Sequence, residues 1–70
     1  MNLSERNTHV KEMANAIQRR EDYYTMKSDK GTHREVRHID LPTPQTCGTM
    51  TQQRTYAMDK AQEILNQFVK

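Results

Sequence analysis

The sequence predicts a small α+β fold in which two amphipathic helices, over about residues 4–22 and 50–69, are joined by a short β-hairpin over about 23–39 and a proline-containing loop. Three observations support this fold class. Apolar residues recur at helical spacing near both ends of the chain. Strand-forming residues flank a turn signal in the middle. Two prolines then separate the middle from the second helical segment. A chain of 70 residues corresponds to one small domain, residues 1–70.

The first helix is predicted from a seven-residue recurrence of apolar side chains. The residues on that face are Leu3, Val10, Met13, Ala14, Ile17 and Tyr24. Asn2 or Ser4 can act as the N-cap, because a short side-chain oxygen accepts a hydrogen bond from an unpaired helical N–H. Glu5 suits the positive end of the helix dipole.

The segment after this helix has two interpretations, and the sequence leaves both open. Residues 23–27 favour a strand, residues 28–31 form a turn signal with Gly31, and residues 32–39 supply a second strand. This interpretation gives the β-hairpin. In the alternative, the first helix continues to Lys27, and the fold is a mainly α-helical hairpin with an irregular middle.

The second helix follows a connector, residues 40–49, in which Pro42 and Pro44 favour extended backbone. Thr49 and Gln52 have the spacing of a capping box. The apolar stripe of the helix consists of Met50, Ala57, Met58, Ala61, Ile64, Leu65 and Phe68.

Large apolar side chains are scarce in this chain. Leu, Ile, Val and Phe together supply 10 of the 70 residues, so a core built from one copy is small. We therefore expect association with another protein, with a second copy as a homodimer, or with both. The net charge of +2 permits a nucleic-acid partner without requiring one. Because no secretory leader and no membrane-length apolar stretch is recognisable, we expect a cytoplasmic protein without a membrane partner.

No pattern in the sequence predicts catalysis. One cysteine, Cys47, and three scattered histidines, His9, His33 and His38, do not match the paired ligand spacing of a zinc site. We expect the histidines to be exposed and the thiol to have no chemical role. The expectation is a protein that is not an enzyme and has no catalytic residues, cofactor, metal or small-molecule substrate.

The middle of the chain combines basic and aromatic residues, and we predict the partner-binding surface there. Its candidate residues are Arg20, Tyr23, Tyr24, Lys27, Lys30, Arg34 and Arg37. The function that the sequence favours is that of a small regulatory, adaptor or inhibitor protein acting through protein–protein interaction and associating with itself. The alternative is a small nucleic-acid-binding regulator, in which the basic groups contact phosphates and the tyrosines stack on bases.

Overall fold

The chain folds as helix, strand, strand and helix. The computed structural model describes residues 3–30 and 33–68, and within the hairpin it describes the side chains of residues 23–26 and 37–40. The elements are α1 (Leu3–Gln18), β1 (Tyr23–Lys30), β2 (His33–Asp40) and α2 (Met50–Phe68). The predicted α+β fold is confirmed, and the alternative with an irregular middle is wrong.

The two helices pack against each other in antiparallel fashion. Near the end of α1 and the start of α2, one Arg54 Nη atom donates to Asn15 Oδ1 at 2.7 Å and to Gln18 Oε1 at 2.8 Å. Arg6 and Asn66 are hydrogen-bonded at the opposite end of the pair. The buried core consists of Val10, Met13, Ala14, Ile17, Met26, Ile39, Ala57, Ala61 and Leu65. The core is therefore built between the helices and completed by two side chains from the hairpin.

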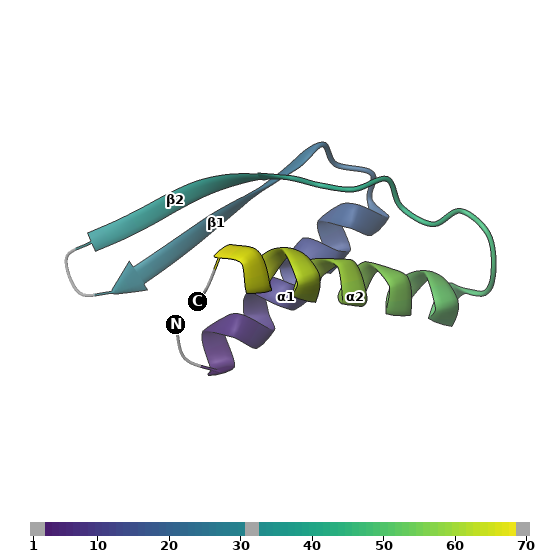
Figure 1. Ribbon diagram of the computed structural model, residues 1–70, viewed down its shortest axis with the longest axis horizontal. Coiled ribbons are helices and arrows are strands. Elements are labelled where there is room, and N and C mark those ends of the chain that lie inside the picture. The colour runs from purple at the N-terminus through teal and green to yellow at the C-terminus, as the bar shows by residue number, and fades with distance from the viewer. Residues whose placement is uncertain (1–2, 31–32, 69–70) are drawn as a thin grey trace.

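The hairpin is a two-stranded antiparallel sheet whose register places Tyr24 opposite Ile39 and Met26 opposite Arg37. Successive side chains of a strand point to opposite faces. Met26 and Ile39 therefore share the face that reaches the helical core, and Tyr23 lies on the other face. Figure 1 shows the paired strands continuing beyond the helices, above the end where the chain termini lie. The molecule is accordingly elongated, 43 × 22 × 17 Å.

Helix α1 ends four residues earlier than the sequence predicts, at Gln18. The Arg20 N–H donates to Ile17 O, the Glu21 N–H donates to Ala16 O, and Arg20 adopts a positive φ of 63°. These are the two hydrogen bonds and the left-handed residue of a Schellman C-cap, which usually places glycine where Arg20 stands. The apolar periodicity did not reveal this stop, because the sequence has an arginine where the usual signal is a glycine.

Helix α2 begins with the predicted capping box. The Gln52 N–H donates to Thr49 Oγ1 at 3.1 Å, and the Thr49 N–H donates to Gln52 Oε1 at 2.9 Å. Gly48 precedes the cap with a φ of 98°, a conformation that side chains with a Cβ rarely adopt. Together, the cap and this glycine redirect the chain from the connector into α2.

Three residues assigned to the apolar stripes are exposed and not in the core. Leu3 and Met50, in the first turns of α1 and α2, are 72% and 76% exposed, and Phe68, the last residue of α2, is 39% exposed. Each lies at the end of a helix, where the partner helix covers it least. The predicted turn also differs, since residues 28–30 belong to β1. Gly31 of that turn and residue 69 of the predicted second helix lie outside the described residues. In the part of the chain that the structure describes, no helix combines the length and hydropathy needed to cross a membrane.

Replacing Arg20 with glycine should stabilise the protein. Left-handed backbone is unfavourable for residues with a Cβ, so Arg20→Gly should raise the free energy of unfolding by about 0.5–1 kcal/mol. The matched control is Arg19→Gly, which removes the same charge from a residue whose N–H donates to Asn15 O. That variant should lose about 0.5–1 kcal/mol. Urea unfolding measures both, and an Arg20→Gly variant no more stable than wild type would contradict the strain argument.

Candidate functional site

Of the seven candidate residues, the four with described side chains lie on the two faces of the hairpin and at the end of α1. Tyr23 is 53% exposed on the outer face of the hairpin, whereas Tyr24 is half-buried on the face toward the helices. Arg20 and Arg37 are exposed. The remaining three are Lys27, Lys30 and Arg34, whose strand positions lie opposite Val36, His33 and Asp29, and whose side chains lie outside the described part of the chain. Strand alternation places Tyr23 and Tyr24 on opposite faces of the hairpin.

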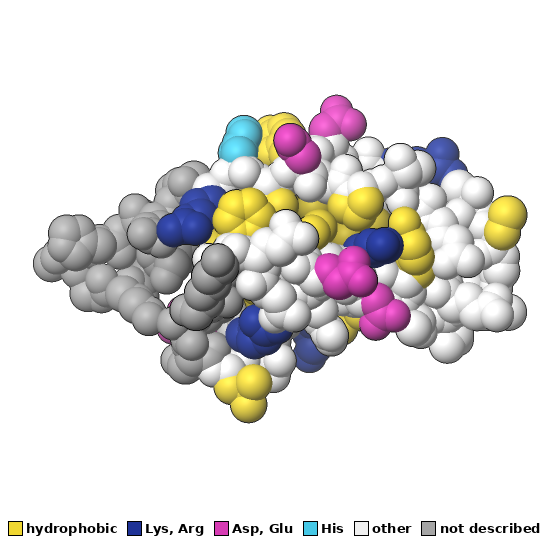
Figure 2. Space-filling view, viewed as in Figure 1, with side chains coloured by type: hydrophobic (Ala, Val, Ile, Leu, Met, Phe, Trp, Pro, Cys, Tyr) yellow, Lys and Arg dark blue, Asp and Glu magenta, His cyan; other side chains and the backbone are white. Residues whose placement is uncertain are grey.

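The outer face at the base of the hairpin carries an aromatic pair and a carboxylate. The Tyr23 ring stacks on the His38 ring with centroids 4.4 Å apart and an interplanar angle of 26°. Asp40 lies directly opposite Tyr23 in the register, and its side chain is exposed. Figure 2 shows acidic and basic side chains interspersed over the described part of the visible face, without a continuous basic area.

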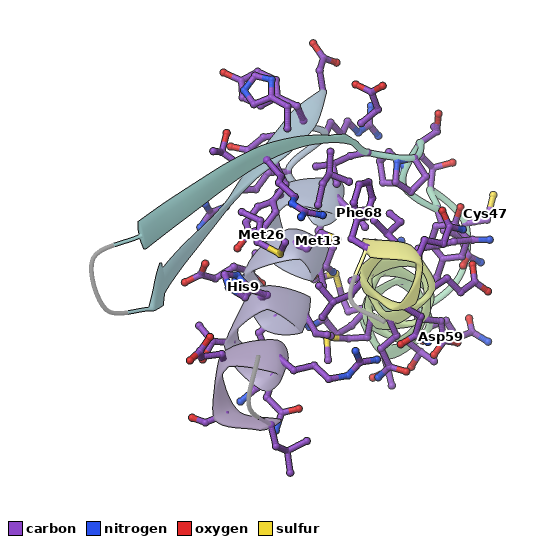
Figure 3. All side chains as sticks on the ribbon, turned by 60° about the vertical axis from the view of Figure 1, so that its left-hand side comes forward. His9, Met13, Met26, Cys47, Asp59 and Phe68 are labelled. Atoms are coloured by element: carbon purple, nitrogen blue, oxygen red, sulfur yellow. The ribbon has the colours of Figure 1, made fainter. Side chains whose placement is uncertain are left out.

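The inner face of the hairpin carries a hydrogen-bonded chain of three side chains. The Tyr24 hydroxyl donates to Glu12 Oε2 at 2.8 Å, and His9 Nδ1 lies 3.0 Å from the same hydroxyl. The His9 and Tyr24 rings also meet edge to face, with centroids 6.3 Å apart. Figure 3 shows His9 on the side of α1 that faces the hairpin. This chain, which we call the His9–Tyr24–Glu12 chain, therefore connects β1 to α1.

The geometry assigns the protons in this chain. A tyrosine hydroxyl has one proton, and here it is donated to the Glu12 carboxylate. The hydroxyl must then accept from His9, so Nδ1 of His9 carries a proton. Both the neutral Nδ1–H tautomer and the imidazolium meet this requirement. The donors therefore run in order from His9 through Tyr24 to Glu12.

The surroundings of Tyr24 favour its neutral form. Burial of the phenol raises its pKa well above the ordinary value of about 10, and the hydrogen bond to Glu12 and the charge of that carboxylate raise the pKa further. An easily ionised phenolate is therefore not formed at this site. Tyr24 acts as a hydrogen-bond donor and a packing residue.

The position of His9 corrects an expectation from the sequence. All three histidines were expected to be exposed, but His9 is only 8% exposed, while His38 is exposed and the His33 side chain lies outside the described residues. His9 lies four residues before the fully buried Met13, on the same helical face. This spacing was visible in the sequence. The bonding partner was not, because Tyr24 comes from a different element.

The exposed thiol of Cys47 lies away from this chain, on the side of α2 that faces away from α1 (Figure 3). It borders an open groove of about 580 Å³ that also includes Thr51, Tyr56 and Asp59. A smaller cavity of about 230 Å³ lies between the end of α1, the connector and the start of α2. Among the described residues, no group of three or more His, Cys, Asp and Glu side chains is placed to hold a metal ion.

Comparisons with known proteins find no match to a family model, to a curated protein or to a solved structure. The functional interpretation therefore depends on the geometry of the hairpin and of the side chains around it.

Removing the Tyr24 hydroxyl should destabilise the protein. Tyr24→Phe leaves His9 Nδ1 and Glu12 without their shared partner and should lower the free energy of unfolding by about 1 kcal/mol. Tyr23→Phe is the matched control, because the Tyr23 hydroxyl makes no hydrogen bond among the described residues, and its effect should stay within about 0.5 kcal/mol. The free energies of unfolding of both variants and of wild type are measured by chemical denaturation at neutral pH.

The same pair of variants tests the pKa of Tyr24. Because the folded-state pKa is raised, the stabilisation from Tyr24 is complete below about pH 10 and is lost as the pH rises above that value, where the unfolded chain ionises first. Wild type and Tyr23→Phe should therefore lose stability in alkaline solution, and Tyr24→Phe should lose less. Equal alkaline slopes for all three proteins would show that Tyr24 has no raised pKa.

Proposed function

We propose that this chain is a small non-enzymatic regulatory, adaptor or inhibitor protein that acts by protein–protein association and that also associates with itself. The observation that carries the proposal is the two-stranded sheet, in which β1 and β2 pair with each other and with no third strand among the described residues. Each strand therefore has one long edge open to pairing. Open strand edges are a common route by which proteins recruit extended segments of partners.

The register shows which backbone groups face outward. The Leu41 N–H donates to Asp22 O at 3.1 Å, so these two residues form a hydrogen-bonded pair at the base of the hairpin. In an antiparallel ladder such pairs alternate with pairs whose N–H and C=O groups point away from the partner strand. Along β1, the groups of Tyr23 and Thr25 therefore point outward, and along β2 those of His38 and Asp40 do so.

Strand addition would also supply stability that one copy lacks. An isolated two-stranded hairpin is marginal in water, and a sheet of three or more strands with a hydrophobic face is more stable. Here Met26 and Ile39 anchor the base of the sheet in the core, while the strands extend beyond the helices (Figure 1). Pairing two copies edge to edge would produce a four-stranded sheet.

The composition of the two edges favours β1 as the paired strand. Charged residues on an edge discourage pairing with other chains. The described part of β2 carries Arg37, His38 and Asp40, whereas the described part of β1, residues 23–26, is uncharged and rich in strand-forming residues.

The chemistry of the described side chains supports a non-enzymatic role. An activated nucleophile needs an adjacent base or a lowered pKa. Cys47 is exposed and makes no hydrogen bond among the described residues, and the Tyr24 phenol is held in its neutral form.

Proline at an outward-facing position of β1 should block association without breaking the hairpin. The inferred register directs the Thr25 N–H away from β2, so Thr25→Pro removes an edge donor and leaves the β1–β2 hydrogen bonds in place. We expect wild type to form a concentration-dependent dimer in sedimentation velocity. Thr25→Pro should weaken it roughly tenfold or more.

The matched control is Thr25→Val, which keeps the N–H and the branched side chain and should dimerise like wild type. His38→Pro alters the opposite edge of the sheet. If only this variant weakens the dimer, the interface lies on β2. A wild-type protein that stays monomeric at all accessible concentrations would refute self-association. Titration with labelled DNA and RNA at low salt tests the nucleic-acid alternative directly.

A further inference from the structure

The cavity of about 230 Å³ lies where the connector leads into α2, at the end of the helix pair opposite the chain termini (Figure 1). Its lining includes Ile17 and Ala57, which belong to the buried core and give it an apolar interior. Tyr56 also lines it, and the Tyr56 hydroxyl donates to Thr43 O of the connector at 3.2 Å. Both helices and the connector therefore build this cavity.

The volume of the cavity limits what it can hold. An apolar cavity of about 150 Å³ accepts benzene, whereas sites for drug-sized molecules and cofactors occupy about 300–1,000 Å³. At about 230 Å³, this cavity has room for one ring or one branched chain with a small polar group. A nucleotide is too large for it.

A cation without a partner borders this apolar interior. Among the described residues, Arg20 is the one charged residue that lines the cavity, and it is exposed, so it lies between the cavity and solvent. Its guanidinium makes no hydrogen bond or ion pair with the part of the chain that the structure describes. Its backbone has a φ of 63° at a position where helices usually place glycine. The planar fork of a guanidinium matches the two oxygens of a carboxylate.

Side-chain amides supply further hydrogen-bond donors to the cavity. Arg54 can only donate, and it donates to Gln18 Oε1 at 2.8 Å. This bond leaves the NH₂ group of Gln18 without an acceptor among the described residues, and the Gln45 side chain is equally uncommitted there. Gln18 and Gln45 both line the cavity. An anionic oxygen at this place can therefore accept from Arg20 and from an amide.

Acidic residues beside the cavity limit the charge of its ligand. A neighbouring hollow shares Arg20, Pro44 and Thr46 with the cavity and is also bordered by Glu21 and Asp22. Both of these residues are exposed. Repulsion between like charges grows with the charge of the ligand. A singly charged carboxylate is therefore favoured over a doubly charged phosphate.

We propose that this cavity binds a small monocarboxylic acid. The apolar body of the acid occupies the interior beside Ile17 and Ala57, and its carboxylate accepts hydrogen bonds from Arg20 and from the Gln18 amide. No histidine, cysteine, Asp or Glu lines the described part of the cavity, so the acid is a ligand and not a substrate. The cavity contains no residue of the hairpin, so the proposal does not depend on self-association.

Titration of the full chain with sodium benzoate, followed by nuclear magnetic resonance, tests the site. Benzoate joins one ring to one carboxylate and is small enough for the cavity. We expect saturable shifts of the backbone amide signals of residues 17–20, 45–46 and 50–57, with a dissociation constant on the order of 1 mM. Sodium chloride at matched ionic strength corrects for the effect of salt.

Two analogues of benzoate test the chemical class of the ligand. Benzamide has the same shape without the charge and should bind about tenfold more weakly or worse. Phenyl phosphate carries a charge of about −1.5 to −2 near pH 7 and should also bind more weakly than benzoate.

Three variants assign the binding to Arg20. Arg20→Gln and Arg19→Gln remove the same charge from adjacent exposed positions, but Arg19 does not line the cavity. Arg20→Gln should weaken benzoate binding about tenfold or more, and Arg19→Gln should bind like wild type. Arg20→Gly should bind as weakly as Arg20→Gln although it is more stable than wild type. A purely structural role of Arg20 does not produce weaker binding in a more stable protein.

Four results would overturn the proposal. The first is the absence of saturable shifts with benzoate, phenylacetate and 3-methylbutanoate up to about 50 mM, roughly fifty times the expected dissociation constant. The second is equal or tighter binding of benzamide or phenyl phosphate. The third is a set of shifts centred on the groove beside Cys47 and Asp59 instead of the cavity. The fourth is unchanged benzoate binding by Arg20→Gln and Arg20→Gly.

Discussion

The fold depends on a small core that neither the helices nor the hairpin can complete alone. Three large side chains, Met13, Ile17 and Leu65, are fully buried, and alanines fill much of the remaining space between the helices. Alanine lets two helices approach closely but buries little apolar area. Met26 and Ile39 from the hairpin add to the same cluster. The hairpin base is therefore part of the core, and the sheet cannot separate fully without exposing it.

This constraint explains why polar contacts are prominent in so small a protein. Arg54 joins the end of α1 to the start of α2, and the Tyr24 hydroxyl joins β1 to α1. Each hydrogen bond lies beside a small apolar contact. It fixes the relative orientation of the two elements, which the apolar contact alone does not determine. These bonds are exposed or only partly buried, so each contributes modest net stability, and their directional geometry favours one arrangement among several of similar apolar area.

The same constraint connects stability with association. A chain that buries few large side chains gains from adding strands to an existing sheet, because backbone hydrogen bonds and side-chain contacts then accumulate without a larger single-chain core. The hairpin is suited to this role, since its base is held by Met26 and Ile39 while its strand edges are open among the described residues.

The sequence by itself determined the elements, because their signals are local. Apolar periodicity placed both helices, the spacing of Thr49 and Gln52 predicted the cap of α2, and strand propensity after Asp22 allowed the hairpin. The tertiary structure determined the features that these local signals do not encode. The end of α1 depends on a left-handed Arg20, and the division of Tyr23 from Tyr24 depends on which face of the hairpin meets the helices. The bonding of His9 and Glu12 depends on a partner 15 and 12 residues away along the chain. Contacts between elements are set by packing, and packing is a property of the whole chain.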